Sequence, residues 1–467
     1  MPDSGENMIQ KKLRQIPSVE KILESPELQS DIDEFSHPVV TAAVKQAVEL
    51  IREEVKKGKE PISTQEIVHK AKEIIAEQTS PALKPVINAS GVILHTNLGR
   101  APLDEESLSF IKNISATYNN LEFDLKEGKR SKRGIFVERL LCFLTSAEAA
   151  LAVNNNAGAV LLILTALAKD KEVIVSRGEL VQIGGGFRIP EILALSGAKL
   201  KEVGTTNQTR ISDYEDAITP ETALLLKVHQ SNFKMIGFVE RPSINELVKL
   251  GKKHNLCVVE DLGSGVLLRT EDFELAHEPT VFEAISADAD LVCFSGDKLL
   301  GAPQAGIILG RGKYIDILKK HPLHRALRLD KMFLAGLERV LLYYLKGEAT
   351  RKIPAWQMIS TPLEALQKRA EKIRDELKKL DIKINIQKSQ STVGGGSLPG
   401  ETLPTIVISF GTKDISPDTC ARLFRQQSPP IIGRIENERF VLDLRTVFPH
   451  QDETLVFAIK NIFLKKS

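Results

Sequence analysis

The segment Asp290–Gly306 points most directly to the fold of this chain: Asp-Leu-Val-Cys-Phe-Ser-Gly-Asp-Lys-Leu-Leu-Gly-Ala-Pro-Gln-Ala-Gly. An apolar strand here runs into a loop of small residues that carries Lys298. Partial desolvation at a strand end lowers the pKa of a lysine, and a neutral amine can form a Schiff base. Ser295, at the end of the strand, can offer a hydroxyl to a phosphate group. Many lysines follow strands without any such role, so this segment alone leaves both interpretations open.

A second segment, Val258–Gly265, reads as a buried strand that ends in a carboxylate, Asp261. A carboxylate against the nitrogen of pyridoxal phosphate keeps that ring protonated, so the ring can accept electrons from a breaking bond at a substrate Cα. The alternative is an aspartate that caps the turn before Gly263.

A third segment, Val153–Val160, contains an Asn-Asn-Asn-Ala-Gly run that leads into the apolar helical pattern 161–168. Backbone N–H groups at a helix start can hold a phosphate, here through Asn156, Ala157 and Gly158. The order of phosphate turn, aspartate and lysine resembles that of the fold-type-I pyridoxal phosphate enzymes. This resemblance implies an α/β, aspartate aminotransferase-like fold with a mostly parallel sheet of the seven-stranded type, and pyridoxal 5′-phosphate bound on Lys298.

Further segments narrow the resemblance to one family. Residues 86–101 look like the signature of the bacterial selenocysteine synthases. Similar segments run nearly end to end, at 13–20, 183–190, 202–207, 295–306 and 393–400. The loop departs from the expected pattern at Ala302, where we expect glycine in relatives.

The resemblance implies a reaction and its partners. The expected enzyme converts seryl-tRNA(Sec) to selenocysteinyl-tRNA(Sec) with selenophosphate, by way of a pyridoxal phosphate aldimine and a dehydroalanyl-tRNA intermediate. The seryl carboxyl is esterified, so its free amine can displace Lys298, which then becomes the leading candidate for the catalytic base. By analogy, family members form dimers assembled into a ring such as a decamer, so a homo-oligomer is expected.

The resemblance also implies roles for other residues. Asp297, next to the lysine, is expected near the reacting group as a catalytic residue, although it could also cap a turn. Arg100, Arg325 and Arg328 look like the family's anion-binding set, and bidentate guanidinium contacts suit selenophosphate. If 323–328 is helical, Arg325 and Arg328 share one face; one of them could instead pair with Asp330 or Asp316. His229 follows an apolar strand and either meets the cofactor ring or is purely structural.

Composition agrees with a large enzyme of two or three domains: the chain has 467 residues, 42% of them hydrophobic, and no apolar run long enough to span a bilayer. The start shows no secretory signal, so we expect a cytoplasmic protein without membrane contact. The cysteines lack C-x-x-C spacing, so neither a disulfide framework nor a metal site is indicated. They are Cys142, Cys257, Cys293 and Cys420.

Hydrophobic periodicity divides the chain into three parts. Residues 1–80 read as a helical domain, with a helix over 39–57 and a capping box at Ser63. Residues 81–340 read as the catalytic core, with strands at 172–176, 223–228, 256–261, 291–295 and 306–309. Residues 341–467 read as an α+β domain, with a helix over 362–380 and strands at 383–387, 405–409 and 440–444.

Charge bears on where a tRNA would bind. Residues 1–80 hold 11 Lys and Arg against 15 Asp and Glu, a net of −4, whereas residues 310–390 hold 19 against 9, a net of +10. Residues 310–390 are therefore better suited by charge to bind a phosphate backbone. The alternative is that these basic residues simply form a solvated helix face. The family resemblance implies that residues 1–80 recognise the tRNA. Because this part is acidic overall, its contacts with the tRNA would have to be local and would recognise the shape of the RNA.

Two other functions are compatible with parts of the sequence. A related pyridoxal phosphate lyase acting on a small free amino acid would share the core but often lacks the N-terminal helices, which this chain has. A non-enzymatic RNA-binding or scaffold protein would be expected to lose Lys298 or Asp261, and both are present.

Overall fold

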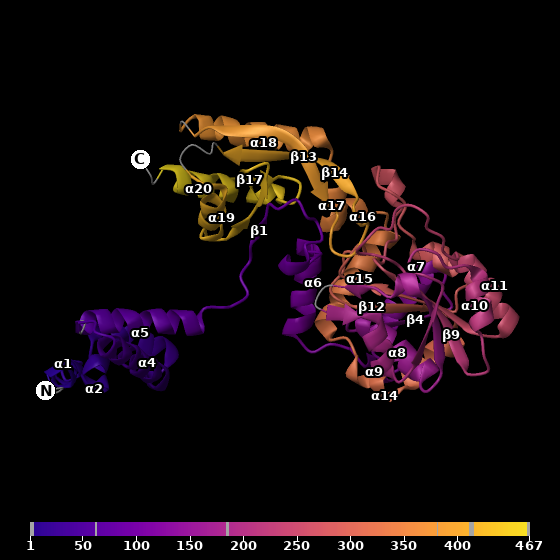
Figure 1. Cartoon of the computed structure of the whole chain (residues 1–467), viewed down its shortest axis with the longest axis horizontal. Coiled ribbons are helices and arrows are strands. Elements are labelled where there is room, and N and C mark those ends of the chain that lie inside the picture. Colours follow the sequence, from indigo (N-terminus) through magenta and orange to yellow (C-terminus); the bar gives the residue numbers. More distant parts are fainter. Residues whose placement is uncertain (1–3, 61–62, 184–185, 381, 411–414, 465–467) are drawn as a thin grey trace. The chain divides into compact units, whose positions relative to one another are not determined.

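The computed structural model describes residues 4–60, 63–183, 186–380, 382–410 and 415–464. The chain divides into two compact units, Met1–Pro85 and Val86–Ser467 (Figure 1). No helix within the described residues is long and apolar enough to cross a membrane.

The first unit consists of helices with a hydrophobic core of their own. Apolar positions at helical spacing, such as Val44, Val48 and Ile51, are buried where α4 packs on α5. The predicted capping box is present at the start of α5, because Ser63 Oγ accepts from Glu66 N and Ser63 N donates to Glu66 Oε2 at 2.8 Å. The helices are α1 (Ser4–Leu13), α2 (Val19–Leu23), α3 (Gln29–Phe35), α4 (His37–Lys56) and α5 (Thr64–Thr79).

The second unit is built on a seven-stranded sheet with the order β4-β12-β11-β10-β9-β5-β8. Only β12 runs antiparallel to its neighbours, so the prediction of a mostly parallel sheet is confirmed. The strands are β4 (Ala149–Val153), β5 (Glu172–Ser176), β8 (Lys199–Val203), β9 (Thr222–Val228), β10 (Cys257–Gly263), β11 (Leu291–Ser295) and β12 (Gly306–Gly310).

Helices cover both faces of this sheet, because alternate side chains of its buried strands point to opposite sides. Leu291 and Cys293 pack toward α8, α9 and α13, whereas Val292 and Phe294 pack toward α7, α11 and α15. The helices are α7 (Ile135–Thr145), α8 (Asn156–Ala168), α9 (Ile189–Ser196), α11 (Ile244–His254), α13 (Gly312–Lys320) and α15 (Lys331–Leu345).

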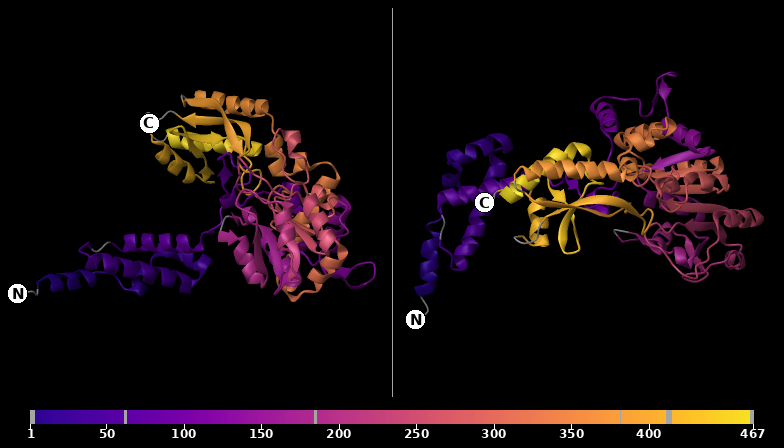
Figure 2. Two further views of the ribbon diagram at one scale, coloured as in Figure 1. Left: turned by 45° about the vertical axis from the view of Figure 1, so that its right-hand side comes forward. Right: turned by 90° about the horizontal axis from the view of Figure 1, so that it is seen from above.

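A four-stranded antiparallel sheet with the order β13-β14-β17-β16 follows, packed with helices α18, α19 and α20 around a separate hydrophobic core. Figure 2 shows the long β13 and β14 strands alongside α18. The expected C-terminal α+β architecture is confirmed, with β13 and β14 longer than the predicted strands. The elements are β13 (Ile384–Thr392), β14 (Thr402–Phe410), β16 (Arg434–Glu436), β17 (Arg439–Asp443), α18 (Leu363–Lys378), α19 (Pro417–Arg425) and α20 (Asp452–Leu464).

The segment that precedes the large sheet joins the two parts of this unit. Ile93 N and Leu94 N donate to the carbonyl oxygens of Thr392 and Val393, so 92–94 lies against the end of β13. The chain then passes through a short 3₁₀ turn, Thr96–Leu98, into α6 (Glu105–Ala116). This route carries Arg100 to the carboxyl ends of the parallel strands, where Ala101 N donates to Asp297 O at 3.4 Å.

Candidate active site

A cavity of about 210 Å³ lies at the carboxyl ends of the parallel strands, where ligands bind in folds of this kind. It gathers eight of the residues singled out in the sequence. They are Arg100, Asn156, Ala157, His229, Asp261, Ser295, Asp297 and Lys298. Gly158 does not line this cavity but lies in the first turn of α8 beside it.

Lys298 is the most deeply enclosed cation of the site, with 4% of its surface exposed. Burial lowers the pKa of its amine, and the nearby Asp261 carboxylate partly opposes that shift. Glycines leave the space around Nζ open: a Cβ added at Gly396 would stand 3.0 Å from Nζ, and one at Gly263 would stand 3.5 Å from it. The lysine therefore has the lowered proton affinity and the free space that attack on a carbonyl group requires.

Asp261 lies near the end of β10, a strand that is buried throughout, and is tied to the start of α8. Asn156 Nδ2 donates to Asp261 Oδ1 at 2.8 Å, and Gly263 N donates to the same oxygen at 3.1 Å. Burial raises the pKa of this carboxyl group, whereas the Asn156 hydrogen bond lowers it. A protonated ring nitrogen placed against Asp261 would compensate the buried negative charge.

The start of α8 also provides hydrogen-bond donors to the cavity. Asn155 caps the helix, because its Oδ1 accepts from Gly158 N at 2.7 Å. The remaining N–H groups of the first turn and the Ser295 hydroxyl at the end of β11 form a setting suited to a phosphate.

Asp297 and Arg100 form an ion pair inside the cavity, with Arg100 Nη1 donating to Asp297 Oδ2 at 2.9 Å. Arg100 has a φ of +61°, a left-handed conformation that a residue with a side chain adopts only when its surroundings enforce it. Asp297 Oδ1 is buried and has no hydrogen-bond partner among the described residues. One carboxylate oxygen is thus held by the arginine and the other is available to a ligand.

His229 follows β9, and its backbone N–H donates to Asp261 O at 2.8 Å. Its Nε2 lies 3.3 Å from Oε1 of Glu278, a buried carboxylate that the sequence did not single out. His229 therefore joins the cavity wall to a second buried acid.

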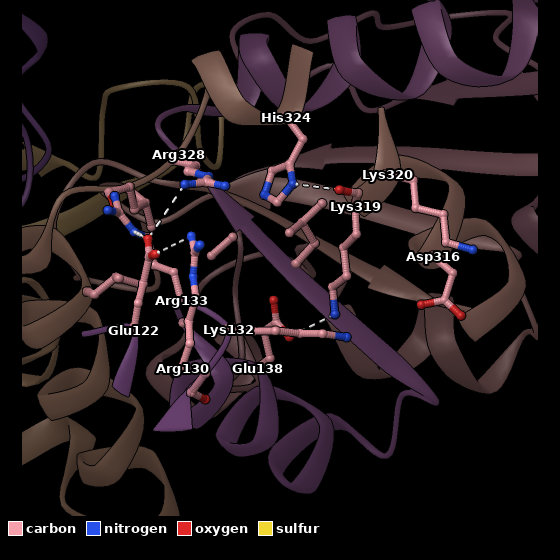
Figure 3. Close-up of a pocket in the computed structure, with 16 residues that line it drawn as sticks. Glu122, Arg130, Lys132, Arg133, Glu138, Asp316, Lys319, Lys320, His324 and Arg328 are labelled. Atoms are coloured by element: carbon pink, nitrogen blue, oxygen red, sulfur yellow. Dashed lines mark hydrogen bonds and ion pairs between the residues drawn. The ribbon is translucent and has the colours of Figure 1, made fainter. Parts of the chain in front are cut away.

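Arg325 and Arg328 do not line this cavity. Helix α14 (Pro322–Ala326) ends before Arg328, so the condition for a shared helix face, a helix over 323–328, is not met. Arg325 is exposed, while Arg328 lines another, largely basic cavity of about 360 Å³ (Figure 3). There its Nη1 lies 3.5 Å from Glu122 Oε1, so neither Asp330 nor Asp316 is its partner.

Sequence reasoning did not assign a role to two features of the site. Ser231 lines the cavity with its Oγ buried and unpartnered among the described residues, and Gly396 approaches Lys298 from the loop after β13. The glycine run Gly394–Gly396 is visible in the sequence, but its approach to Lys298 depends on the packing of the C-terminal sheet. Gly184 and Gly185 of the motif at 183–190 lie outside the described residues.

Comparisons with known proteins agree along nearly the whole chain. A family model described as L-seryl-tRNA selenium transferase matches residues 86–448, and one described as selenocysteine synthase N terminal matches residues 13–52. The L-seryl-tRNA(Sec) selenium transferase of Carboxydothermus hydrogenoformans is 47% identical over 95% of this chain and 96% of the relative. That of Alkaliphilus oremlandii is 43% identical over 96% of this chain and 98% of the relative.

Among solved structures, a D-glucosaminate-6-phosphate ammonia-lyase matches with a TM-score of 0.58 and 20% identity, covering 83% of this chain and 97% of the lyase. At that identity the match bears on the fold alone, and it supports the expected α/β architecture of the second unit.

Proposed function

This chain belongs to the L-seryl-tRNA selenium transferase family, and from that membership we propose that it converts L-seryl-tRNA(Sec) to L-selenocysteinyl-tRNA(Sec) with selenophosphate as donor. The observation that carries the proposal is the burial of Lys298 beside Asp261 in one cavity, in a chain so similar to these enzymes over nearly its full length.

The family depends on pyridoxal phosphate, and the residues of the cavity fit that group. Lys298 offers an amine of lowered pKa, Asp261 a buried carboxylate, and Ser231 a buried hydroxyl with no partner among the described residues. We assign covalent attachment to Lys298, the ring nitrogen to Asp261 and the ring surroundings to His229. The phosphate is assigned to Asn156, Ala157 and Ser295; Gly158 belongs to the same helix start, where its N–H is already bonded to Asn155 Oδ1. When bound, this cofactor supplies an acceptor for the electrons of a breaking bond at the substrate Cα.

The protein's own groups then handle the proton and the leaving hydroxyl. Lys298, once free of the cofactor, is a neutral amine beside Cα and can accept its proton. Asp297 is oriented through Oδ2 by Arg100, which leaves Oδ1 to bind the substrate near its β-hydroxyl. Enclosure of Lys298 and Asp297 keeps bulk water away from the reacting carbon.

The anionic donor is assigned to Arg100 together with Arg325 and Arg328. Arg325 and Arg328 lie outside the cavity of their own chain, so in this proposal a second copy of the chain supplies the pair to Lys298. By analogy with the family we propose a homo-oligomer of dimers, assembled into a ring such as a decamer.

We assign tRNA recognition to residues 1–80, cofactor binding to 81–340 and the smaller α+β domain to 341–467. The helical unit has a core of its own, as an independent binding module requires. A cytoplasmic location follows from the proposed substrate, because aminoacyl-tRNA is made and used there.

The experiment is a spectral titration of the protein with its cofactor. Seryl-tRNA(Sec) is expected to change the visible absorption, whereas seryl-tRNA(Ser) and free serine are expected to leave it unchanged. A response to free serine with none to seryl-tRNA(Sec) would contradict the proposal and favour a lyase acting on a free amino acid.

A further inference from the structure

A second, larger cavity lies beside the one that holds Lys298. Its volume is about 520 Å³, within the range of about 300–1,000 Å³ typical of small-molecule sites. It is formed between the segment that follows β9, the turn around Thr96, and the loop 394–401 that joins β13 to β14. The proposed function leaves this cavity without an occupant.

The two cavities adjoin each other. Arg100 and Ser231 line both of them, and Gly396, which lines the larger cavity, approaches Lys298 Nζ. Ser231 Oγ lies 3.6 Å from the position that a Cβ would take at Gly263, and equally far from that at Gly396. A ligand that reaches Lys298 can therefore extend past Ser231 and Gly396 into the larger cavity.

The chemistry of the substrate requires such an extension. In an aminoacyl-tRNA the seryl carbonyl carbon is bonded to Cα and, through the ester oxygen, to the terminal ribose. A substrate whose Cα reacts at Lys298 must therefore place that ribose and its base immediately outside the smaller cavity. We propose that the cavity formed by 231–234 and 394–401 binds the 3′-terminal adenosine of the aminoacyl-tRNA. This inference rests on the proposed function and adds a nucleoside subsite to it.

The groups that line this cavity suit a nucleoside. Ser397 is 2% exposed, and its Oγ has no hydrogen-bond partner among the described residues, so it is available to a ribose hydroxyl or a base nitrogen. Phe233 is 37% exposed at the cavity wall and provides an aromatic face on which a base can stack. The charged side chains that line the cavity are already paired: Lys234 Nζ lies 3.5 Å from Glu401 Oε1, and Arg100 is bound to Asp297. A neutral base fits this setting better than a free anion does.

The glycine run keeps the passage between the cavities open. Gly394, Gly395 and Gly396 have φ values of +75°, +60° and +80°, a conformation that disfavours side chains. A Cβ at Gly394 would meet Val92 at 2.4 Å, and one at Gly395 would meet Leu94 O at 2.2 Å. The loop is thus fixed against 92–94 on one side and presents bare backbone toward Lys298 on the other.

The test compares two probes on the full chain with its cofactor bound. In 3′-(L-serylamino)-3′-deoxyadenosine an amide replaces the ester, so the seryl-adenosine unit is stable; L-serinamide lacks the nucleoside. The dissociation constants are read from the visible spectrum of the cofactor. We expect the seryl-adenosine amide to bind at least tenfold more tightly than serinamide.

Variants connect that difference to the cavity. Phe233→Leu and Ser397→Ala should each reduce the advantage of the seryl-adenosine amide by about threefold to tenfold and leave serinamide binding unchanged. Matched controls are Phe457→Leu, an exposed phenylalanine on α20, and Ser409→Ala, a buried serine whose Oγ is also unpartnered among the described residues. Neither control should change either affinity.

The outcomes separate this inference from the proposed function. Equal affinity for the two probes, or variants no different from their controls, would overturn the nucleoside subsite even if intact seryl-tRNA(Sec) is converted. A preference for the seryl-adenosine amide that depends on Phe233 and Ser397 would support the subsite. If a protein that shows this preference did not convert seryl-tRNA(Sec), the proposed reaction would be contradicted and the nucleoside subsite would stand.

Discussion

Arg100 Nη1 donates a hydrogen bond of 2.9 Å to Asp297 Oδ2, so residues 197 positions apart form an ion pair one residue away from Lys298. Burial lowers the pKa of the Lys298 amine, the negative charge of Asp261 opposes this shift, and the positive charge of Arg100 adds to it. The pair therefore links the signature segment at 86–101 to the acidity of the lysine.

Replacing Arg100 with methionine should raise the pKa of Lys298, because a nearby positive charge is removed and Asp297 is left without its cation. Covalent coupling of the cofactor to Lys298 needs the neutral amine, so the pH at which half of the protein is coupled should move upward. A pH titration of the visible absorption measures this shift. Arg177→Met, which breaks a half-exposed pair with Glu202 outside the cavity, is the control. A midpoint unchanged in Arg100→Met would contradict the electrostatic link.

Lys298→Ala should abolish covalent attachment of the cofactor, because no other lysine lines the cavity among the described residues. Borohydride reduction followed by intact mass measurement reports the attachment directly. Lys201→Ala removes a partly buried lysine paired with Glu172 and should leave the adduct at the wild-type level. An undiminished adduct in Lys298→Ala would place the cofactor elsewhere.

The double variant Arg325→Ala with Arg328→Ala should raise the apparent KM for selenophosphate. A charge-assisted hydrogen bond contributes about 1.5–3 kcal/mol, which corresponds to tenfold or more for each arginine that contacts the donor. The spectral response to seryl-tRNA(Sec) should persist, since neither side chain lines the cavity of its own chain. Arg351→Ala, which removes an exposed pair with Glu348, should change neither quantity. Unchanged donor saturation in the double variant would exclude both arginines from the donor site.

Glu260 gives the fold a pH dependence of its own. Burial raises the pKa of this carboxyl to about 7, so between its ordinary value of 4.5 and about 7 the folded state binds the proton more tightly than the unfolded state. Stability from this group is therefore fully present below pH 4.5 and is lost as pH rises toward 7 and beyond. At about 1.4 kcal/mol per pKa unit the loss approaches about 3 kcal/mol. Glu260→Gln should remove this component, and urea unfolding of both proteins between pH 5 and 8 measures it. If the free energy of unfolding depended on pH in the same way in the wild type and in Glu260→Gln, the raised pKa of Glu260 would be contradicted.

Removing residues 1–85 should leave the cofactor bound, because every residue that lines the Lys298 cavity belongs to the second unit. Affinity for tRNA(Sec) should fall at least tenfold if the helices recognise it. Filter binding with labelled tRNA(Sec) tests this, with the visible spectrum as a check on folding. Tight binding of tRNA(Sec) by the shortened chain would indicate that the basic stretch 310–390 recognises the tRNA instead.

The strands around the site could be predicted from sequence because each is a short apolar run that ends in polar or small residues. For example, Leu291–Ser295 has the predicted bounds, and β10 extends only two residues beyond the predicted end at Asp261. The carboxyl ends of neighbouring parallel strands meet, so the clustering of Asp261, Ser295 and Lys298 follows from the fold class.

Long-range packing accounts for what sequence could not predict. The approach of Gly396 to Lys298 depends on how the C-terminal sheet packs against 92–94, which no local pattern encodes. Similarly, α14 ends at Ala326 because the chain next pairs with the edge of the large sheet: Asn154 N donates to Leu327 O, and Arg328 pairs with Val153. Arg328 is thereby carried off the helix and away from the lysine.

The antiparallel strand β12 has a consequence for how the lysine is held. Ser295 pairs with Gly306, so the loop that carries Lys298 is closed by two adjacent strands of a hairpin and not by a helical crossover. Its geometry is therefore assembled from neighbours in the chain, whereas its electrostatic surroundings include residues as distant as Arg100 and Asp261. Substitutions in those remote segments are expected to change the pKa of the Lys298 amine, while the hairpin keeps the lysine in position. The reactivity of Lys298 can therefore change during evolution without a change in the structure of the loop.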